Sequence, residues 1–233
     1  MVGLVVFDVD GTLSRTSGVD DRCWCEAARE VLGVESMTTD WSCYSHSTDE
    51  AIATDLIVAR FGGRPDDPEV QARVREIRDD FTARIRSEIA RSPDCAHPVP
   101  GACEVFAGLD AAGWAVAIAT GGWRATAELK LETAGIPFEG VPAAHADDAH
   151  PREEIISRAI ERSRVVGPTV YVGDGVWDVR AATRRGIGFV GIGRGESADR
   201  LTKAGARVTL SDYTDFEDFL HAVGNASPAG SSD

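Results

Sequence analysis

Residues 2–13 read Val-Gly-Leu-Val-Val-Phe-Asp-Val-Asp-Gly-Thr-Leu, an apolar run followed by an acidic turn. The run from Val2 to Phe7 has the length and β-branched content of a buried strand, and Gly11 interrupts the pattern. Asp8 and Asp10 therefore stand at the carboxyl end of a strand, where open α/β sheets bind their ligands. Neighbouring carboxylates repel each other, and a divalent cation with oxygen ligands is the commonest reason to bury them. A plain Asp-Gly turn after a strand is the alternative interpretation.

Two later segments have the same form, an apolar run that ends in glycines and polar side chains. Residues 115–122 end in Thr120 and two glycines, which offer a hydroxyl and a loop of a size that suits phosphate. Residues 170–178 carry Asp174 between two glycines and Asp178 four residues later. Three strand ends with oxygen ligands or a phosphate-sized loop form a more specific pattern than any one of them.

In order and spacing, these segments resemble the motifs of the haloacid dehalogenase superfamily of aspartate-nucleophile phosphohydrolases. The first motif, Asp-x-Asp-Gly-Thr, matches at residues 8–12, the second matches at Thr120, and the fourth, Gly-Asp-x-x-x-Asp, matches at residues 173–178. The resemblance covers about residues 1–223. Within the superfamily, the organisation is similar to the phosphoglycolate phosphatase and β-phosphoglucomutase group, whose members carry a helical C1-type cap.

The resemblance implies a Mg²⁺-dependent phosphatase that forms an aspartyl-phosphate intermediate. Asp8 would be the nucleophile, and Asp10 would protonate the leaving alcohol and later deprotonate the attacking water. Thr120 and the amides near Gly121 would hold phosphate oxygens at a helix N-terminus. The implied Mg²⁺ ligands are Asp8, Asp10 through its backbone carbonyl, Asp174, and Asp178 directly or through water.

The third motif departs from the family pattern, which usually has a Lys ahead of a helix. The chain has two lysines, Lys130 and Lys203. Lys130 lies far along the helix after the second motif, roughly 12 Å or more from the strand end at about 1.5 Å per residue, and Lys203 follows the last acidic motif. Residues 147–156 take the place of the motif, and Arg152 is predicted to fill the role because a guanidinium is always charged and binds phosphate bidentately. His150 is the reserve, and an exposed first-turn position is the alternative for Arg152.

The rest of the chain predicts an α/β fold, a doubly wound parallel sheet with a Rossmann-like core. Expected strands lie at 2–7, 114–120, 141–144, 169–173, 187–192 and 207–210. Residues 14–99 show no convincing strand pattern and predict helices at 21–32, 48–61 and 69–89, the last with an apolar stripe that we interpret as core packing. We therefore expect a catalytic core of residues 1–13 and 100–224, an inserted helical cap of 14–99, and a disordered tail of 225–233.

A cap inserted between the first two motifs would close over the site, exclude water and select the substrate. Residues 44–49 are the best candidates for a loop that contacts the substrate. Ser47 or Thr48 is equally suited to cap the following helix, and we favour capping. Trp41 and Tyr44 either cover an apolar part of the ligand or pack the cap.

The composition of the chain excludes several classes of protein. Of the 233 residues, 43% are hydrophobic and 27% charged, as in ordinary globular proteins. No run approaches the ~18 apolar residues of a membrane span and no signal peptide is visible, so a cytoplasmic enzyme is expected. The net charge of −14 argues against binding nucleic acid or anionic membranes, which leaves a small phosphorylated metabolite as the expected partner. The five cysteines are expected to be reduced and without a chemical role.

Neighbouring activities of the family differ by single residues. A haloalkanoate dehalogenase needs neither a second acid nor a metal, so Asp10 and the acidic fourth motif speak against it. A phosphonoacetaldehyde hydrolase needs a Schiff-base Lys in the cap, and no Lys precedes Lys130. Phosphatase is therefore the predicted activity. A phosphosugar mutase or phosphotransferase, and a catalytically degenerate protein that binds a phosphate ligand, are the alternatives.

Overall fold

The centre of the protein is a parallel β-sheet. The computed structural model describes residues 2–16 and 18–227. The strands of the sheet are β1 (Gly3–Phe7), β4 (Trp114–Ala119), β5 (Ala143–Ala144), β6 (Thr169–Gly173), β7 (Gly188–Ile192) and β8 (Thr209–Leu210). They pair in parallel in the order β5-β4-β1-β6-β7-β8, so β1 lies between the strands that carry the second and fourth motifs.

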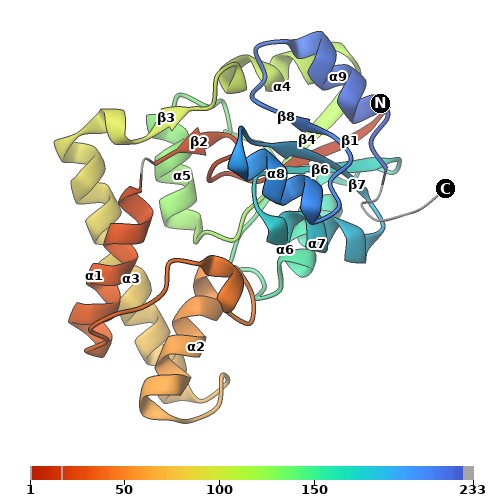
Figure 1. Cartoon of the computed structure of the whole chain (residues 1–233). Coiled ribbons are helices and arrows are strands. Elements are labelled where there is room, and N and C mark those ends of the chain that lie inside the picture. Colours follow the sequence, from red (N-terminus) through yellow and green to blue (C-terminus); the bar gives the residue numbers. More distant parts are fainter. Residues whose placement is uncertain (1, 17, 228–233) are drawn as a thin grey trace.

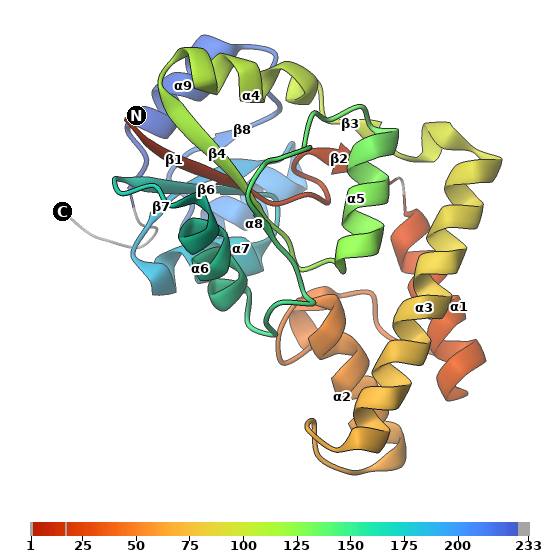
Figure 2. The same ribbon diagram turned by 180° about the vertical axis from the view of Figure 1, so that it is seen from behind.

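Helices alternate with these strands and cover both faces of the sheet, which confirms the predicted doubly wound α/β fold. The helices are α4 (Ala102–Ala111), α5 (Arg124–Thr133), α6 (Arg152–Ser163), α7 (Val176–Arg185), α8 (Glu196–Lys203) and α9 (Phe216–Gly224). Figures 1 and 2 show α4 and α9 on one side of the sheet and α6 and α7 on the other.

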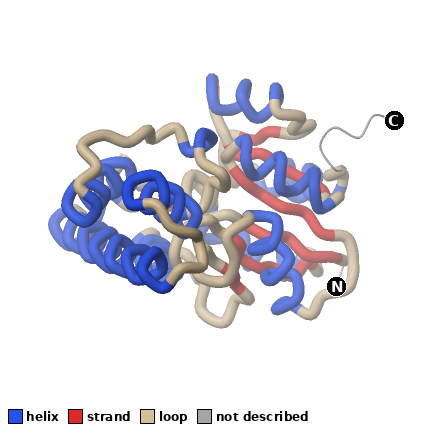
Figure 3. Tube along the Cα trace, turned by 90° about the horizontal axis from the view of Figure 1, so that it is seen from below, coloured by secondary structure: helices blue, strands red, loops and turns tan. Residues whose placement is uncertain are grey.

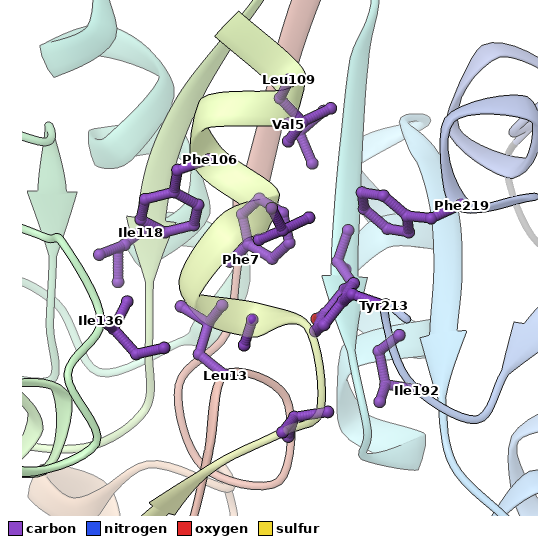
Figure 4. Close-up of a cluster of buried hydrophobic side chains, with 14 of the residues drawn as sticks. Val5, Phe7, Leu13, Phe106, Leu109, Ile118, Ile136, Ile192, Tyr213 and Phe219 are labelled. Atoms are coloured by element: carbon purple, nitrogen blue, oxygen red, sulfur yellow. The ribbon is translucent and has the colours of Figure 1, made fainter. Parts of the chain in front are cut away.

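Side chains of β1 alternate between the two faces, as the period of a strand requires. Val5 and Phe7 pack into the cluster on the side of α4 and α9, whereas Leu4 and Val6 pack on the side of α6 and α7. Figure 4 shows Phe7 at the centre of the first cluster, where its ring centroid lies 5.3 Å from that of Phe106. Burial of both faces explains why β1 is apolar throughout its length rather than alternating.

The remaining helices form a separate bundle beside the sheet. They are α1 (Val19–Leu32), α2 (Asp49–Phe61) and α3 (Pro68–Arg91), with short 3₁₀ turns η1 (Trp41–Cys43) and η2 (Pro93–Cys95). Figure 3 shows this bundle to one side of the strands. The apolar stripe of α3 is buried, which confirms its interpretation as core packing, and its members are Val70, Val74, Ile77, Phe81, Ile85 and Ile89. None of the described helices is both long and apolar enough to cross a membrane.

The expectation that residues 14–99 contain no strand is wrong at both ends of that segment. β2 (Ser14–Arg15) and β3 (His97–Pro98) pair antiparallel and form the connection through which the chain enters and leaves the helical bundle. Strands of two residues are too short to show an alternating pattern, so sequence periodicity cannot detect them. The division into core and cap stays a prediction, and of the predicted disordered tail residues 228–233 lie outside the described residues.

Candidate active site

The acidic side chains of the first and fourth motifs come together at the carboxyl edge of the sheet. Asp8 directly follows β1, Asp174 directly follows β6, and Asp178 lies in the first turn of α7. Because β1 and β6 are neighbours, one carboxylate oxygen from each of these three residues lies within 4.8 Å of the other two. Asp8 and Asp178 are almost fully buried, at 3% and 0% exposure.

Arg152 brings a positive charge into this cluster. Its Nη1 lies 3.0 Å from Oδ1 of Asp8 and 3.0 Å from Oδ1 of Asp178. Burial lowers the pKa of Arg152, but the two carboxylates raise it more, and the guanidinium stays charged. The structure thus places Arg152 beside Asp8, while His150 contributes its backbone carbonyl, which accepts a hydrogen bond of 2.8 Å from Thr48.

The electrostatics of the cluster fit a divalent cation. Burial raises the pKa of Asp8 to about 6; Arg152 opposes this shift and Asp178 adds to it. Burial, Asp8 and Asp178 also raise the pKa of Asp174 well above its usual value. Three carboxylates, two of them buried and Asp174 partly exposed, face one guanidinium, which leaves an excess of negative charge at the site. Carboxylate oxygens grouped in this way are the donors that hard divalent cations take.

Gly11 lets the first motif approach the fourth. It adopts a φ of 75°, in the left-handed region that favours glycine. A Cβ at this position would lie 1.9 Å from Oδ2 of Asp174. The Asp-Gly turn after β1 is therefore required by the close packing of the site and is more than a generic strand ending.

The second motif forms a tight loop at the end of β4. Thr120 is 1% exposed, and its Oγ1 accepts a hydrogen bond of 3.1 Å from the backbone N–H of Gly122. Asp8, Thr120 and Gly121 line the same cavity. The predicted phosphate ligands, from the end of β4 and from α6, thus lie in one place with the predicted nucleophile Asp8.

Replacing Gly121 with Ala is expected to disturb the site directly. A Cβ there would lie 2.3 Å from Nη2 of Arg152 and 2.7 Å from the carbonyl oxygen of Ser47. We expect Gly121→Ala to cost about 1–3 kcal/mol of stability through overpacking. We also expect about a 10²-fold lower turnover, because the guanidinium is displaced. Denaturant unfolding and phosphate release from an ester measure the two effects. Gly224→Ala is the matched control, since nothing lies within 4 Å of its added Cβ, and equal effects of both variants would contradict the argument.

The side chain of Asp10 does not join the acidic cluster, because its Oδ1 pairs with Nζ of Lys130 at 2.8 Å. The expectation that Lys130 lies too far along its helix to reach the site is wrong. Side chains of a helix tilt toward its N-terminus, and here the long lysine stem spans the gap to Asp10. Nζ also lies 2.7 Å from Oδ1 of Asp20 in the first turn of α1. Burial lowers the pKa of Lys130, but Asp10 and Asp20 raise it more, so the ammonium remains charged.

The segment that precedes α2 docks onto the loops of the sheet edge. Nη2 of Arg152 donates to the carbonyl of Ser47 over 2.9 Å, and the amide of Asp49 donates to the carbonyl of Gly121 over 2.7 Å. Thr48 is the N-cap residue of α2, as predicted, but its hydroxyl makes no capping hydrogen bond in that helix and donates to the carbonyl of His150 instead. Residues of the expected substrate loop thus hold the helical bundle over the site.

A cavity of about 290 Å³ lies between the sheet edge and the helical bundle. The sheet side contributes the predicted residues Asp8, Asp10, Thr120, Gly121, Arg152 and Asp174, together with Lys130. The helical side contributes acidic and apolar residues, most of the latter aromatic, namely Asp20, Asp21, Trp24, Trp41, Asp49, Ile52 and Phe81. Trp41 thus lines the cavity while its ring also stacks on Tyr44.

Sequence reasoning missed Tyr171 as well as Lys130 and Asp20. The hydroxyl of Tyr171 donates to the carbonyl of Ala119 at 3.0 Å and contacts Asp178 at 3.2 Å. A tyrosine inside an otherwise aliphatic strand needs a polar partner when it is buried, and that was the available signal. No comparable signal marked Lys130, since nothing in the spacing ties it to Asp10.

Comparison with known proteins agrees with this geometry. The family model of haloacid dehalogenase-like hydrolases matches residues 2–186. The chain belongs to this family. Among curated proteins, "Probable phosphatase IndB" of Dickeya dadantii (strain 3937) is 26% identical over 230 residues, covering 96% of this chain and 95% of that protein. This haloacid dehalogenase-like hydrolase therefore belongs to the family that its sequence motifs predicted, and it has a relative named as a probable phosphatase.

Solved structures of low sequence identity share the fold. β-Phosphoglucomutase from Clostridium difficile superposes with a TM-score of 0.71 at 17% identity, covering 96% of this chain and 98% of that one. CbbY from Rhodobacter sphaeroides, solved in complex with phosphate, gives a TM-score of 0.67 at 21% identity, covering 93% and 96%. These matches confirm the core architecture of the haloacid dehalogenase-like hydrolase.

Proposed function

We propose that the chain is a Mg²⁺-dependent phosphatase that hydrolyses a small phosphate monoester through an aspartyl-phosphate intermediate. The observation that carries the proposal is that two carboxylates on one short turn, Asp8 and Asp10, point to different surroundings. Asp8 lies in the acidic cluster beside Arg152, whereas the Asp10 side chain lies outside that cluster and pairs with Lys130. A nucleophile inside the cation site and a proton carrier outside it suit a two-step transfer of a phosphoryl group.

In the first step, a carboxylate oxygen of Asp8 attacks phosphorus, and the bond from phosphorus to the alcohol oxygen breaks. Protonated Asp10 donates its proton to that departing oxygen. Burial raises the pKa of Asp10 to about 6, although Lys130 opposes the shift, so a protonated fraction exists near neutral pH. In the second step, Asp10 accepts a proton from water as the water oxygen attacks phosphorus. Asp8 then leaves as a carboxylate, and inorganic phosphate is released.

Phosphate binding falls to Thr120, the backbone amide of Gly121 and Arg152, which line the cavity next to Asp8. Arg152 neutralises the charge that the nucleophile and the phosphate bring together, in a place where water does not compete. Its two contacts, to Asp8 and to the carbonyl of Ser47, also fix its orientation.

The carboxylates of Asp8 and Asp174 and the backbone carbonyl of Asp10 would hold Mg²⁺. Asp178 would act through water, because its Oδ2 already accepts from the amide of Gly175 at 2.9 Å and its Oδ1 pairs with Arg152 at 3.0 Å. When bound, Mg²⁺ screens the charge of the phosphate from the attacking carboxylate.

The charges of the cavity favour a phosphatase over a mutase. Among the described residues that line it, the cations are Lys130 and Arg152, and each already pairs with two carboxylates. The helical side instead offers carboxylates and tryptophans. A mutase passes through a bisphosphate, whose second phosphate would meet these carboxylates without a free cation, and like charges in contact cost several kcal/mol. We therefore propose a substrate whose alcohol part carries no second negative charge.

Phosphate release from a panel of esters, with Mg²⁺ and with a chelator, tests this function. We expect turnover of esters with uncharged alcohols, such as sugar monophosphates and glycerol 2-phosphate, and at least about tenfold less turnover of phosphoglycolate. Chelation should lower the rate by about 10²-fold or more, and added Mg²⁺ should restore it. Equal rates with metal and with chelator would contradict the metal dependence. If only a bisphosphate turned over, the mutase would be the correct function.

A further inference from the structure

Lys130 occupies an unusual position for a lysine. It is 3% exposed and lies between Asp10, on the turn after β1, and Asp20, in the first turn of α1. A buried ammonium is costly unless it is paired, and here the two carboxylates supply the pairing. The three residues come from α5, the nucleophile turn and the helical bundle, so one ion triad joins three separate parts of the fold.

The contact between Lys130 and Asp10 makes the two oxygens of the Asp10 carboxyl group different. Lys130 donates to Oδ1, and a proton on Oδ1 would face a cation, so the transferable proton belongs on Oδ2. Oδ2 lies toward the loop of residues 120–122 after β4, called here the phosphate loop. It and Oγ1 of Thr120 are each 3.6 Å from the position that a Cβ at Gly122 would take. Fixing Oδ1 thus directs Oδ2 to the side where the leaving oxygen of the ester would lie.

Asp20 holds the ammonium from the other side. Its Oδ1 contacts Nζ, and its Oδ2 accepts a hydrogen bond from the hydroxyl of Thr16. Asp20 stands in α1, only a few residues beyond β2, where the chain enters the helical bundle. The position of α1 is therefore linked through Lys130 to the orientation of the Asp10 carboxyl group.

We propose that Lys130 is a positioning residue that orients Asp10 for proton transfer to the leaving group, and that Asp20 holds Lys130 in place. The proposal rests on the phosphatase function above. In the first step, the proton moves from Oδ2 of Asp10 to the alcohol oxygen as its bond to phosphorus breaks. Lys130 keeps its own protons throughout.

Leaving-group dependence separates this role from a purely structural one. An alkyl ester such as glycerol 2-phosphate needs a proton on its departing oxygen, whereas p-nitrophenolate leaves as a stable anion. Lys130→Met keeps the length of the side chain and removes its charge. The two esters are compared in kcat/KM, which reports the first step alone, because Asp10 also accepts a proton in the second step, which both esters share. We expect the variant to lower kcat/KM by about 10²-fold for the alkyl ester, within the usual range for general acid catalysis. We expect less than about threefold for p-nitrophenyl phosphate. An equal loss for both esters would overturn the proposal.

A double-mutant cycle tests whether Lys130 acts through Asp10. In an Asp10→Asn background, Lys130→Met should cost no further rate with the alkyl ester, because the oriented proton is already gone. If Lys130→Met lowered the rate of the Asp10→Asn protein by the same factor as that of the wild type, Lys130 would have a function separate from Asp10. Lys130→Arg, which keeps the charge, should recover part of the alkyl-ester rate, and no recovery would count against the proposal.

Asp20→Asn covers the case in which Lys130→Met fails to fold. It leaves the contact between Lys130 and Asp10 intact but weakens the hold on the ammonium, so we expect about a tenfold loss confined to the alkyl ester. A loss shared equally by both esters would contradict the role of Asp20. If the wild-type protein hydrolysed neither ester, the phosphatase function would fail, and that outcome is distinct from every outcome of the Lys130 variants.

Discussion

Asp8→Asn is expected to abolish phosphatase turnover while leaving the fold intact. An amide oxygen is a poor nucleophile. The carboxylates of Asp174, after β6, and of Asp178, in the first turn of α7, lie on other elements and cannot replace it in line with the phosphate loop. Loss of the attacking group in enzymes with covalent intermediates costs about 10⁴-fold or more in kcat. Phosphate release from the best ester of the panel, with Mg²⁺ present, measures the effect.

The folded state of this variant should be at least as stable as the wild type. Burial raises the pKa of Asp8 to about 6, which shows that its charge is unfavourable where it lies. Asn has almost the same shape, and Arg152 keeps its ion pair with Asp178. We expect a Tm within a few degrees of wild type, measured by thermal unfolding. More than about 1% residual turnover in a folded Asp8→Asn protein would assign the nucleophile to another residue.

Arg152→Ala is the second change with a large expected effect, and His150→Ala is its matched control. Removing the guanidinium takes away a charged donor next to the nucleophile, which typically costs about 10²–10³-fold in kcat. It also leaves Asp8 and Asp178 without their partner, a loss of about 3–5 kcal/mol for a buried pair. His150→Ala keeps the backbone carbonyl that accepts from Thr48, so its kcat should stay within about threefold of wild type.

Arg152→Lys separates the loss of charge from the loss of geometry. A single ammonium restores positive charge but cannot repeat the separate contacts of Nη1 to Asp8 and of Nη2 to Ser47. We expect Arg152→Lys to recover most of the stability and only part of the rate, as shown by denaturant unfolding and steady-state kinetics. If His150→Ala lost as much rate as Arg152→Ala, the phosphate-binding role of Arg152 would be wrong.

Sequence patterns were enough to predict the part of the site that lies at the ends of strands. An apolar run of strand length followed by Asp8 and Asp10 predicts a buried strand with its acids at the carboxyl edge, and the same holds for Asp174 after β6. Parallel pairing of neighbouring strands then brings these acids together without further information. Helices with a clear apolar stripe, α3 above all, were equally visible, because a period of 3.6 residues marks the buried face.

The sequence did not predict contacts between elements that are far apart along the chain. Arg152 and His150 flank the same proline, and their spacing alone could not decide between them. The direction in which α6 starts gives Arg152 the contact with Asp8. Thr48 has the sequence position of a helix cap, yet its hydroxyl bonds to the loop at His150, because the helical bundle rests on that loop.

The sequence by itself determined the doubly wound sheet, the acidic edge of the site and the family to which the chain belongs, because each depends on local runs and their order. Only the tertiary structure decided that Lys130 meets Asp10 and Asp20, and that acidic and aromatic side chains face the phosphate loop across the cavity. Those pairings depend on the angle at which helices pack and on the reach of long side chains. Neither quantity is encoded in the spacing of residues along the chain.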